Sequence, residues 1–409
     1  MQGTTKPAFK RLAALILLAA LLILPACSPG EPPRGSGSMA AYVSAEGLTL
    51  YRFDTGEIEL LCSGGRISAP VFSADGQYVY YKNASDVFCA PLSGGRHMLA
   101  AVNADYLCDY GGKAAFLSRV NGVTLFDPAA GEAAQLIAQP ENGFIAAAAF
   151  SPDGSRAVYS VCLADAGRTR LTALCVTVPG SDAPDVYPAA QFPAGSVPRP
   201  VAWSPDGSTC YLAVGAPDAE TQELYAFSVI DGALSDLNGR TPEITASGEL
   251  HVSGDGRFLL ACAYKSSSDE YESLLRLDLA TRSYTYLPGG YAPLLGVCIS
   301  YDGSMAAYGL GETETASHGV FVYANDKTLL IHGGAGTSCV YPSFFHDGLE
   351  LYFLDTGGET ASLCRALSNS SGATKLFDGI AAPDGVYLKT LRDAFCVYDT
   401  TVFAAETGQ

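Results

Sequence analysis

The sequence is poor in several residue types that catalytic and metal sites use. Charged residues make up only 16% of the 409 residues, against 48% hydrophobic residues, which excludes an intrinsically disordered chain. The chain has a single Trp and five His. The histidines lie far apart in the sequence, at His97, His251, His318, His332 and His346. Because no HExxH or HxH pattern occurs, the common local zinc-hydrolase motifs are absent.

Other catalytic signatures are also missing. The sequence holds no GxSxG nucleophile elbow, no phosphate-binding glycine loop between a strand and a helix, and no Cys-x-x-Cys pair. We expect no α/β hydrolase domain after the repeats described below, which argues against a peptidase of the prolyl-oligopeptidase kind. We therefore predict no catalytic residues and no metal ligands from local motifs.

A basic surface is lacking as well. Lys and Arg number 24 against 42 Asp and Glu, giving a formal net charge of −18. Such a surface repels phosphate backbones, so we expect no nucleic-acid partner. It also repels anionic lipid, so attachment to a membrane would need a covalent anchor.

The longest apolar run is too short to span a bilayer. It covers Leu12–Leu24, follows three basic residues, and would form a helix of about 20 Å against a hydrocarbon core of ~30 Å. This pattern predicts a signal peptide over residues 1–26. The next residues, Leu24-Pro25-Ala26-Cys27, resemble the bacterial lipobox, although Pro25 is an unusual occupant. The resemblance implies that Cys27 receives a lipid; the alternative is an ordinary secretory signal with an incidental Cys.

The signal peptide and the lipobox-like segment together predict a lipoprotein anchored to the outer face of the bacterial membrane, in the cell envelope. Residues 27–38 are rich in Pro, Gly and Ser and are expected to form a flexible tether. Eleven of the twelve cysteines remain after Cys27, and seven lie in apolar, strand-like runs. We expect mostly reduced, buried thiols, with one or two disulfides left open. The seven are Cys62, Cys89, Cys175, Cys262, Cys298, Cys364 and Cys396.

One motif recurs along the chain: an aromatic or apolar residue, Ser, any residue, Asp-Gly, then an apolar run. Its Asp residues are separated by 78, 53, 49, 47 and 45 residues, and they are Asp75, Asp153, Asp206, Asp255, Asp302 and Asp347. A degraded copy at 108–117 lies between Asp75 and Asp153, so the gap of 78 residues corresponds to two repeats. The segment 383–388 resembles a last copy. Gly at positive φ and an Asp that bonds to nearby backbone predict a hairpin turn between two buried strands.

A second hairpin alternates with the first. Eight such segments lie near residues 50, 87, 123, 171, 224, 274, 320 and 362. The segment 274–287 alternates apolar residues with period two, as a strand does. Two hairpins per roughly 45 residues give four antiparallel strands, the unit of a propeller blade.

The Ser-Pro-Asp-Gly copies resemble the WD40-like repeats of TolB-type propellers over nearly all of residues 40–400. The resemblance implies a ring of blades in which the strand before each motif lines the central channel. It supplies no catalytic residues, and the separate N-terminal domain of TolB is not expected here. We predict one all-β domain over 39–409, a β-propeller of eight four-stranded antiparallel blades. Seven blades is the alternative, because the runs at 40–44 and 394–399 are surplus to the repeat.

Two candidate sites follow from this arrangement. His251 replaces the small residues that other copies carry on the inner strand, so it could face the channel as a ligand or proton carrier. Long acidic loops between the second and third strands, at 163–169, 215–223, 264–273 and 309–319, predict a binding rim for a cationic partner or Ca²⁺. The rim candidates are Asp269, Glu270, Glu272, Glu312 and Glu314.

The functional prediction is a non-catalytic, membrane-anchored binding or scaffold propeller with no required cofactor. Its partner would be a protein or glycan of the envelope, and the chain is expected to be monomeric. The alternative is a carbohydrate-active enzyme resembling the lyase-type propellers, or a glycan-binding module. Three or more His or carboxylate groups converging within ~5 Å in the channel would favour a metal enzyme, whereas an apolar channel would favour a scaffold.

Overall fold

The computed structural model describes most of the chain after the predicted signal peptide and tether. The described residues are 37–110, 113–118, 120–165, 168–181, 183–237, 244–245, 250–266, 269–287, 292–311, 318–334, 339–345, 347–357, 360–381 and 392–399. By its internal contacts the chain divides into residues 1–36 and 37–409, and only the second unit is described below. The predicted signal peptide and Cys27 lie outside the described residues.

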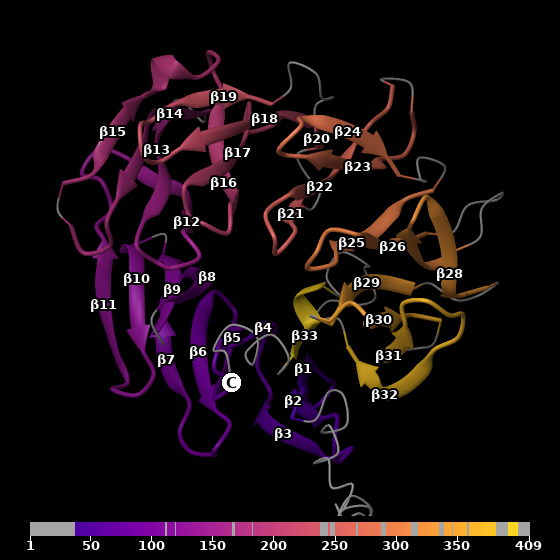
Figure 1. Ribbon diagram of the computed structural model, residues 1–409. Helices are drawn as coiled ribbons and strands as arrows, with labels where there is room; N and C mark the ends of the chain where they lie inside the picture. The colour runs from indigo at the N-terminus through magenta and orange to yellow at the C-terminus, as the bar shows by residue number, and fades with distance from the viewer. Residues whose placement is uncertain are drawn as a thin grey trace, which may run out of the picture. The chain divides into compact units, whose positions relative to one another are not determined.

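Seven of the eight blades are built from strands that follow one another in the chain (Figure 1). We number them blades 2 to 8, because the closing blade contains the first strand.

Blade 2 contains β4(Ile67–Phe72), β5(Tyr78–Asn83), β6(Asp86–Pro91) and β7(Met98–Ala101). Blade 3 contains β8(Ala104–Tyr110), β9(Lys113–Ser118), β10(Gly122–Asp127) and β11(Glu132–Ile137). Blade 4 contains β12(Phe144–Phe150), β13(Ala157–Asp165), β14(Arg168–Thr177) and β15(Asp185–Pro188). Blade 5 contains β16(Val197–Trp203), β17(Thr209–Gly215), β18(Thr221–Ser228) and β19(Leu234–Asp236), and the short strand β20(Ile244–Thr245) also pairs with β18. Blade 6 contains β21(Leu250–Val252), β22(Phe258–Ala263), β23(Ser273–Asp278) and β24(Ser283–Tyr286). Blades 7 and 8 contain β25(Leu294–Ile299), β26(Met305–Leu310), β27(Gly319–Ala324), β28(Lys327–Gly333); and β29(Cys339–Phe344), β30(Glu350–Asp355), β31(Ala361–Leu367), β32(Thr374–Ile380).

Blade 1 closes the ring with strands from both ends of the described chain. It contains β33(Phe395–Tyr398), β1(Met39–Val43), β2(Gly47–Arg52) and β3(Ile58–Ser63), hydrogen-bonded in that order. The register places Ala40 opposite Val397 and Ala41 opposite Cys396. The runs at 40–44 and 394–399, which left seven blades as the alternative, therefore pair with each other and complete an eighth blade. The eighth inner pair is not the predicted hairpin at 383–388, which lies outside the described residues.

The first strand of each blade lies on the inside of the ring. Contacts run from β12 to β16, from β16 to β21, from β21 to β25 and from β25 to β29, while β33 contacts β4. This arrangement confirms the predicted β-propeller, with the strand before each motif facing the axis. The described helices are two short 3₁₀ turns, η1(Ala189–Gln191) and η2(Arg392–Ala394).

No helix in the described part of the chain is long and apolar enough to cross a membrane.

The repeated motif forms the predicted turn between the first two strands. In blade 4 the Ser151 hydroxyl donates to Asp153 Oδ1 at 2.7 Å, and the backbone N–H of Ser155 donates to the same oxygen at 3.0 Å. The Ser151 hydroxyl also accepts the backbone N–H of Arg156 at 3.0 Å. Gly154 has a φ of 66°, which only glycine adopts without cost. We call the face of the ring that carries these turns the turn face, and the opposite face the loop face.

Buried side chains lie mainly between blades rather than within one. One cluster joins Val158 and Leu174 of blade 4 to Leu212 of blade 5, and another joins Leu260 of blade 6 to Tyr308 of blade 7. Eleven described cysteines are free thiols, eight of them buried and three half-buried. Buried thiols behave as small apolar side chains, so they contribute to these clusters.

Candidate functional site

A hollow of about 390 Å³ lies between the inner strands on one side of the channel. Its wall comes from β4, β21, β25, β29, β30, β33 and the η2 turn, so blades 1, 2, 6, 7 and 8 all contribute. Most of the lining is apolar, with Pro70, Val297, Pro342 and Val397 among it. A small, mostly apolar concavity with a few polar groups is the usual form of a binding pocket.

Irregular backbone shapes this wall. The pairing of β4 with β5 slips between Ser68 and Val71, and that of β29 with β30 slips between Val340 and Ser343. At these bulges Ala69 and Tyr341 have φ angles of 48° and 54°, in the left-handed region that L side chains rarely adopt. Both residues line the hollow. Backbone strain of this kind, about 1–3 kcal/mol per residue, concentrates at functional sites in proteins generally.

Gly296 on β25 precedes the lining residue Val297. Its φ is 89°, and a Cβ built on it would lie 2.7 Å from the Cα of Tyr341 in the next blade. Any side chain at Gly296 would therefore push β25 away from β29. The close approach of these two inner strands depends on glycine at this position.

Five polar side chains line the hollow: His251, Tyr341, Ser343, Tyr352 and Asp393. Burial is the main cause that raises the pKa of Tyr352, with the charge of neighbouring acids and thiols adding to it, so its hydroxyl stays protonated. Burial likewise raises the pKa of the Cys396 thiol to about 12. His251, the sequence candidate, lies on β21 opposite Leu260 and lines this hollow. It is the one histidine in the described lining.

The hollow adjoins two others along the channel. One, of about 560 Å³, shares Val71, Ser343, Tyr352, Cys396 and Val397 with it and opens among the residues that flank the turns, such as Tyr301. The other, of about 770 Å³, shares Asp393 and opens on the loop face beside Glu46 and Arg66. The central hollow therefore shares lining residues with a hollow toward each face of the ring.

The described rim residues lie on a loop of blade 6, on the loop face. Asp269 accepts the backbone N–H of Ser266 at 3.0 Å, which fixes part of that loop. Burial raises the pKa of Tyr264, and the charges of Glu272 and of Glu220 in blade 5 raise it further. The acidic loops of two neighbouring blades therefore approach each other around Tyr264.

Two details of the predicted rim change. Segment 163–169 is mostly strand, because β13 continues to Asp165 and β14 starts at Arg168. Glu312 and Glu314 lie outside the described residues, so the structure places only Asp269, Glu270 and Glu272 of the five candidates.

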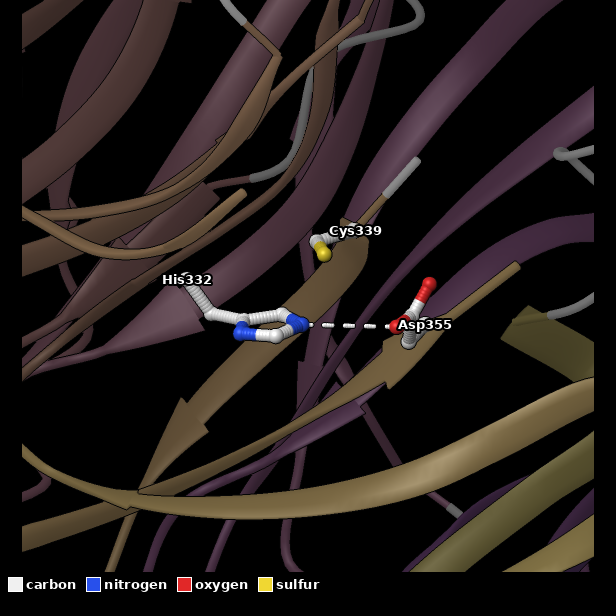
Figure 2. A group of neighbouring side chains, drawn as sticks. All are labelled: His332, Cys339 and Asp355. Carbon is white, nitrogen blue, oxygen red and sulfur yellow. Dashed lines mark hydrogen bonds and ion pairs between the residues drawn. The ribbon is translucent and has the colours of Figure 1, made fainter. Parts of the chain in front are cut away.

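The structure also brings together three side chains that sequence motifs did not predict: His332, Cys339 and Asp355 (Figure 2). They come from β28, β29 and β30, on the loop-face side of the boundary between blades 7 and 8. Their ligand atoms lie within 4.8 Å of one another, and His332 Nε2 is 3.4 Å from Asp355 Oδ2. Burial raises the pKa of Cys339, with the charges of Asp355 and Cys364 adding to the effect. None of the three lines the central hollow.

The spacing of these residues in the sequence does not predict the cluster. The three residues belong to three strands of two blades, so no local motif contains them. Their approach depends on two facts that only the fold supplies. Cys339 pairs with Asp355 across β29 and β30, and His332, near the end of β28 in the preceding blade, lies beside them.

The fold and the channel define the chain as an eight-bladed β-propeller of four-stranded blades. Solved propellers resemble it. An oligogalacturonate lyase in complex with manganese aligns over 82% of this chain and 98% of its own, with a TM-score of 0.50 and 12% identity. An oligogalacturonate lyase from Vibrio parahaemolyticus aligns over 80% and 96%, with a TM-score of 0.51 and 11% identity.

A dihydro-heme d1 dehydrogenase aligns over 89% of this chain and 75% of its own, with a TM-score of 0.59 and 15% identity. Identities this low establish the shared fold alone. Neither a protein-family model nor a curated relative matches the sequence.

Proposed function

We propose that this chain is a membrane-anchored binding propeller of the bacterial envelope, which receives an apolar group of a protein partner in the central hollow. The observation that carries the proposal is the hollow itself. Five blades build it, two strained non-glycine residues shape it, and a few polar groups lie among apolar ones. Strained backbone of this kind clusters at ligand-binding and active sites, so it supports a binding role for this wall.

The chemistry of the wall supports binding rather than turnover. Among the described lining residues, the only imidazole is that of His251 on β21, and the only carboxylate is that of Asp393 on the η2 turn. The described cluster of three potential ligands lies elsewhere, between blades 7 and 8. Ser343 and Tyr352 offer hydroxyl groups that could orient a partner's polar atom at the edge of the apolar surface.

Attachment to the membrane is the second part of the proposal. The Leu-Pro-Ala-Cys segment supports lipidation at Cys27, and a tether over 27–38 would hold the propeller at the outer face of the membrane. Labelling cells with a radioactive fatty acid tests this part. The wild-type chain should carry label and fractionate with membranes, whereas Cys27→Ala should lose both.

Filling the hollow tests the binding role. The bait is the intact lipoprotein in detergent-solubilised envelope, with bound proteins quantified by mass spectrometry. Ser343→Phe adds an aromatic ring to the hollow wall, so a partner of wild type should fall at least tenfold. Ser155→Ala is the control, because this exposed serine lies on the turn of blade 4 away from the hollow. Equal recovery with Ser343→Phe and wild type would refute the hollow as the binding site.

The acidic rim provides a separate arm of the same experiment. Replacing Asp269, Glu270 and Glu272 with Ser removes three carboxylates from the loop face of blade 6. If a cationic partner or Ca²⁺ binds there, recovery or calcium affinity should fall and should depend on salt concentration. Unchanged binding would remove the rim from the proposal and leave the hollow unaffected.

A carbohydrate-active enzyme or glycan-binding module is the alternative, and the shared fold with two oligogalacturonate lyases is the observation that favours it. Incubation of the protein with oligogalacturonate tests it. Ultraviolet absorbance of an unsaturated product that disappears with His251→Ala would establish a lyase and overturn the non-catalytic proposal. Saturable binding of the oligosaccharide without product would establish a glycan-binding module instead.

A further inference from the structure

We propose that His332, Cys339 and Asp355 bind one divalent transition metal ion of the Zn²⁺ type, which ties blade 7 to blade 8. The site is independent of the central hollow and does not rest on the function proposed above. It joins the outermost strand of blade 7, which carries His332, to the two innermost strands of blade 8, which carry Cys339 and Asp355.

The spacing of the nitrogen and oxygen donors fits a tetrahedral ion. With metal–nitrogen and metal–oxygen bonds of about 2.0–2.2 Å, two ligand atoms on a tetrahedral zinc lie about 3.3–3.5 Å apart. The observed distance between His332 Nε2 and Asp355 Oδ2 is 3.4 Å. The Cys339 sulfur completes a set whose atoms all lie within 4.8 Å of one another, and it points toward the other two side chains (Figure 2).

Neighbouring groups hold two of the ligands in orientation. The backbone N–H of Gly357 donates to Asp355 Oδ1 at 3.0 Å, which leaves Oδ2 directed at the histidine. The ring of His332 packs against Phe353, with centroids 5.6 Å apart. Ordered outer partners of this kind usually accompany metal ligands, because they reduce the freedom lost on binding.

The donor types select the class of metal. A thiolate, an imidazole and one carboxylate oxygen suit zinc and similar transition metals, whereas Ca²⁺ takes six to eight oxygen ligands. Among the ion pairs of the described residues, Asp355 has no lysine or arginine partner that a metal would have to displace. Within the described residues, the carboxylate therefore faces the cluster without a competing fixed cation.

Access to the site comes from the histidine and carboxylate side. Cys339 is fully buried, whereas the side chains of His332 and Asp355 are 30% and 23% exposed. Three protein ligands with an open side leave room for a water as a fourth ligand. The competing interpretation is a plain His–Asp hydrogen bond beside a buried cysteine, which predicts no metal binding.

Titration with Co²⁺ distinguishes the two interpretations. The protein starts at residue 28, carries no histidine tag, and is treated with chelator and reductant before use. We expect one equivalent of Co²⁺ to give a tetrahedral visible spectrum and a sulfur-to-cobalt charge-transfer band, both removed by one equivalent of Zn²⁺. Ca²⁺ and Mg²⁺ at the same concentration should give no displacement.

Variants assign the ligands. Cys339→Ser should abolish the charge-transfer band, and Cys162→Ser, an equally buried free cysteine in blade 4, should retain it. His332→Gln and Asp355→Asn change partly exposed side chains, so both variants should fold. They still test the assigned ligands if Cys339→Ser fails to fold. Each should weaken Zn²⁺ binding at least tenfold and remove the rise in Tm that Zn²⁺ gives wild type. A band that persists in Cys339→Ser, or wild-type affinity in His332→Gln, would overturn the assignment.

Discussion

At the scale of single residues, the Ser-x-Asp-Gly turn recurs around the ring. In five blades the Ser hydroxyl donates to the Asp carboxylate at 2.6–2.8 Å. In the sixth copy Phe345 replaces the Ser, yet Asp347 still accepts the backbone N–H of Leu349 at 2.9 Å. The turn therefore tolerates loss of the hydroxyl when an aromatic side chain fills the same place.

These hydrogen bonds should make stability depend on pH in acid. The Ser151 hydroxyl, followed by the backbone and hydroxyl of Ser155, lowers the pKa of Asp153 to about 2, and similar bonds lower the pKa of Asp206. In the unfolded chain an Asp has a pKa of about 3.9. Because the folded pKa is the lower one, the stabilisation is present above pH about 4 and is lost as pH falls toward 2.

We expect Tm to fall across that interval and to fall less steeply in Asp153→Asn, whose side chain cannot titrate. The variant should also have a slightly lower Tm at pH 7, since an amide oxygen is a weaker acceptor than a carboxylate. Differential scanning calorimetry at half-unit pH steps measures both effects. Superimposable curves for variant and wild type would contradict the assigned cause.

At the scale of elements, each turn also contributes to packing between blades. A Cβ on Gly303, in the turn of blade 7, would lie 2.3 Å from the Cδ2 of Phe258 in blade 6. A Cβ on Gly207, in the equivalent turn of blade 5, would meet nothing nearer than 3.5 Å. Both glycines have nearly the same φ, 68° and 65°. The pair therefore separates backbone strain from crowding between blades.

Gly303→Ala should destabilise the protein more than Gly207→Ala. The left-handed backbone costs each variant about 1–2 kcal/mol. Gly303→Ala should lose about 1–3 kcal/mol more, because its methyl group must displace a packed ring. Urea unfolding followed by circular dichroism gives both free energies of unfolding. Equal losses would mean that Phe258 moves aside without cost.

At the scale of the whole molecule, stability depends on closing the ring. β33 covers β1, whose five residues are all buried, and it also contacts β4 of blade 2. Without β33 the inner edge of blade 1 would have unpaired backbone groups and exposed apolar side chains. Open edges of this kind favour aggregation.

A chain truncated after Ala394 should therefore be strongly destabilised, by more than about 5 kcal/mol, since several buried apolar side chains lose their cover. It should also lose cooperative unfolding in calorimetry and elute partly as aggregate in size-exclusion chromatography. A chain truncated after Asp399 keeps β33 and serves as the control. Similar Tm values for the two truncated chains would show that the ring does not need this strand.

The sequence alone determined the repeated unit and the class of fold. The repeated unit rests on local constraints: Gly at positive φ, an Asp that accepts local N–H groups, and period-two alternation. Such constraints can be recognised in the sequence before the fold is known. They predicted the turns at Asp75 to Asp347, eight outer hairpins, buried thiols and an inner-strand position for His251. The predicted lipid anchor at Cys27 and the full acidic rim stay predictions, because the structure does not describe those residues in full.

Only the tertiary structure decided which strands close the ring and which side chains meet. Residues 40–44 and 394–399 were surplus to a local repeat, because the partner of each lies at the opposite end of the chain. His332, Cys339 and Asp355 meet because one blade ends where the next begins. Contacts between blades arise from packing faces around a circle, and no local pattern in the chain encodes that geometry.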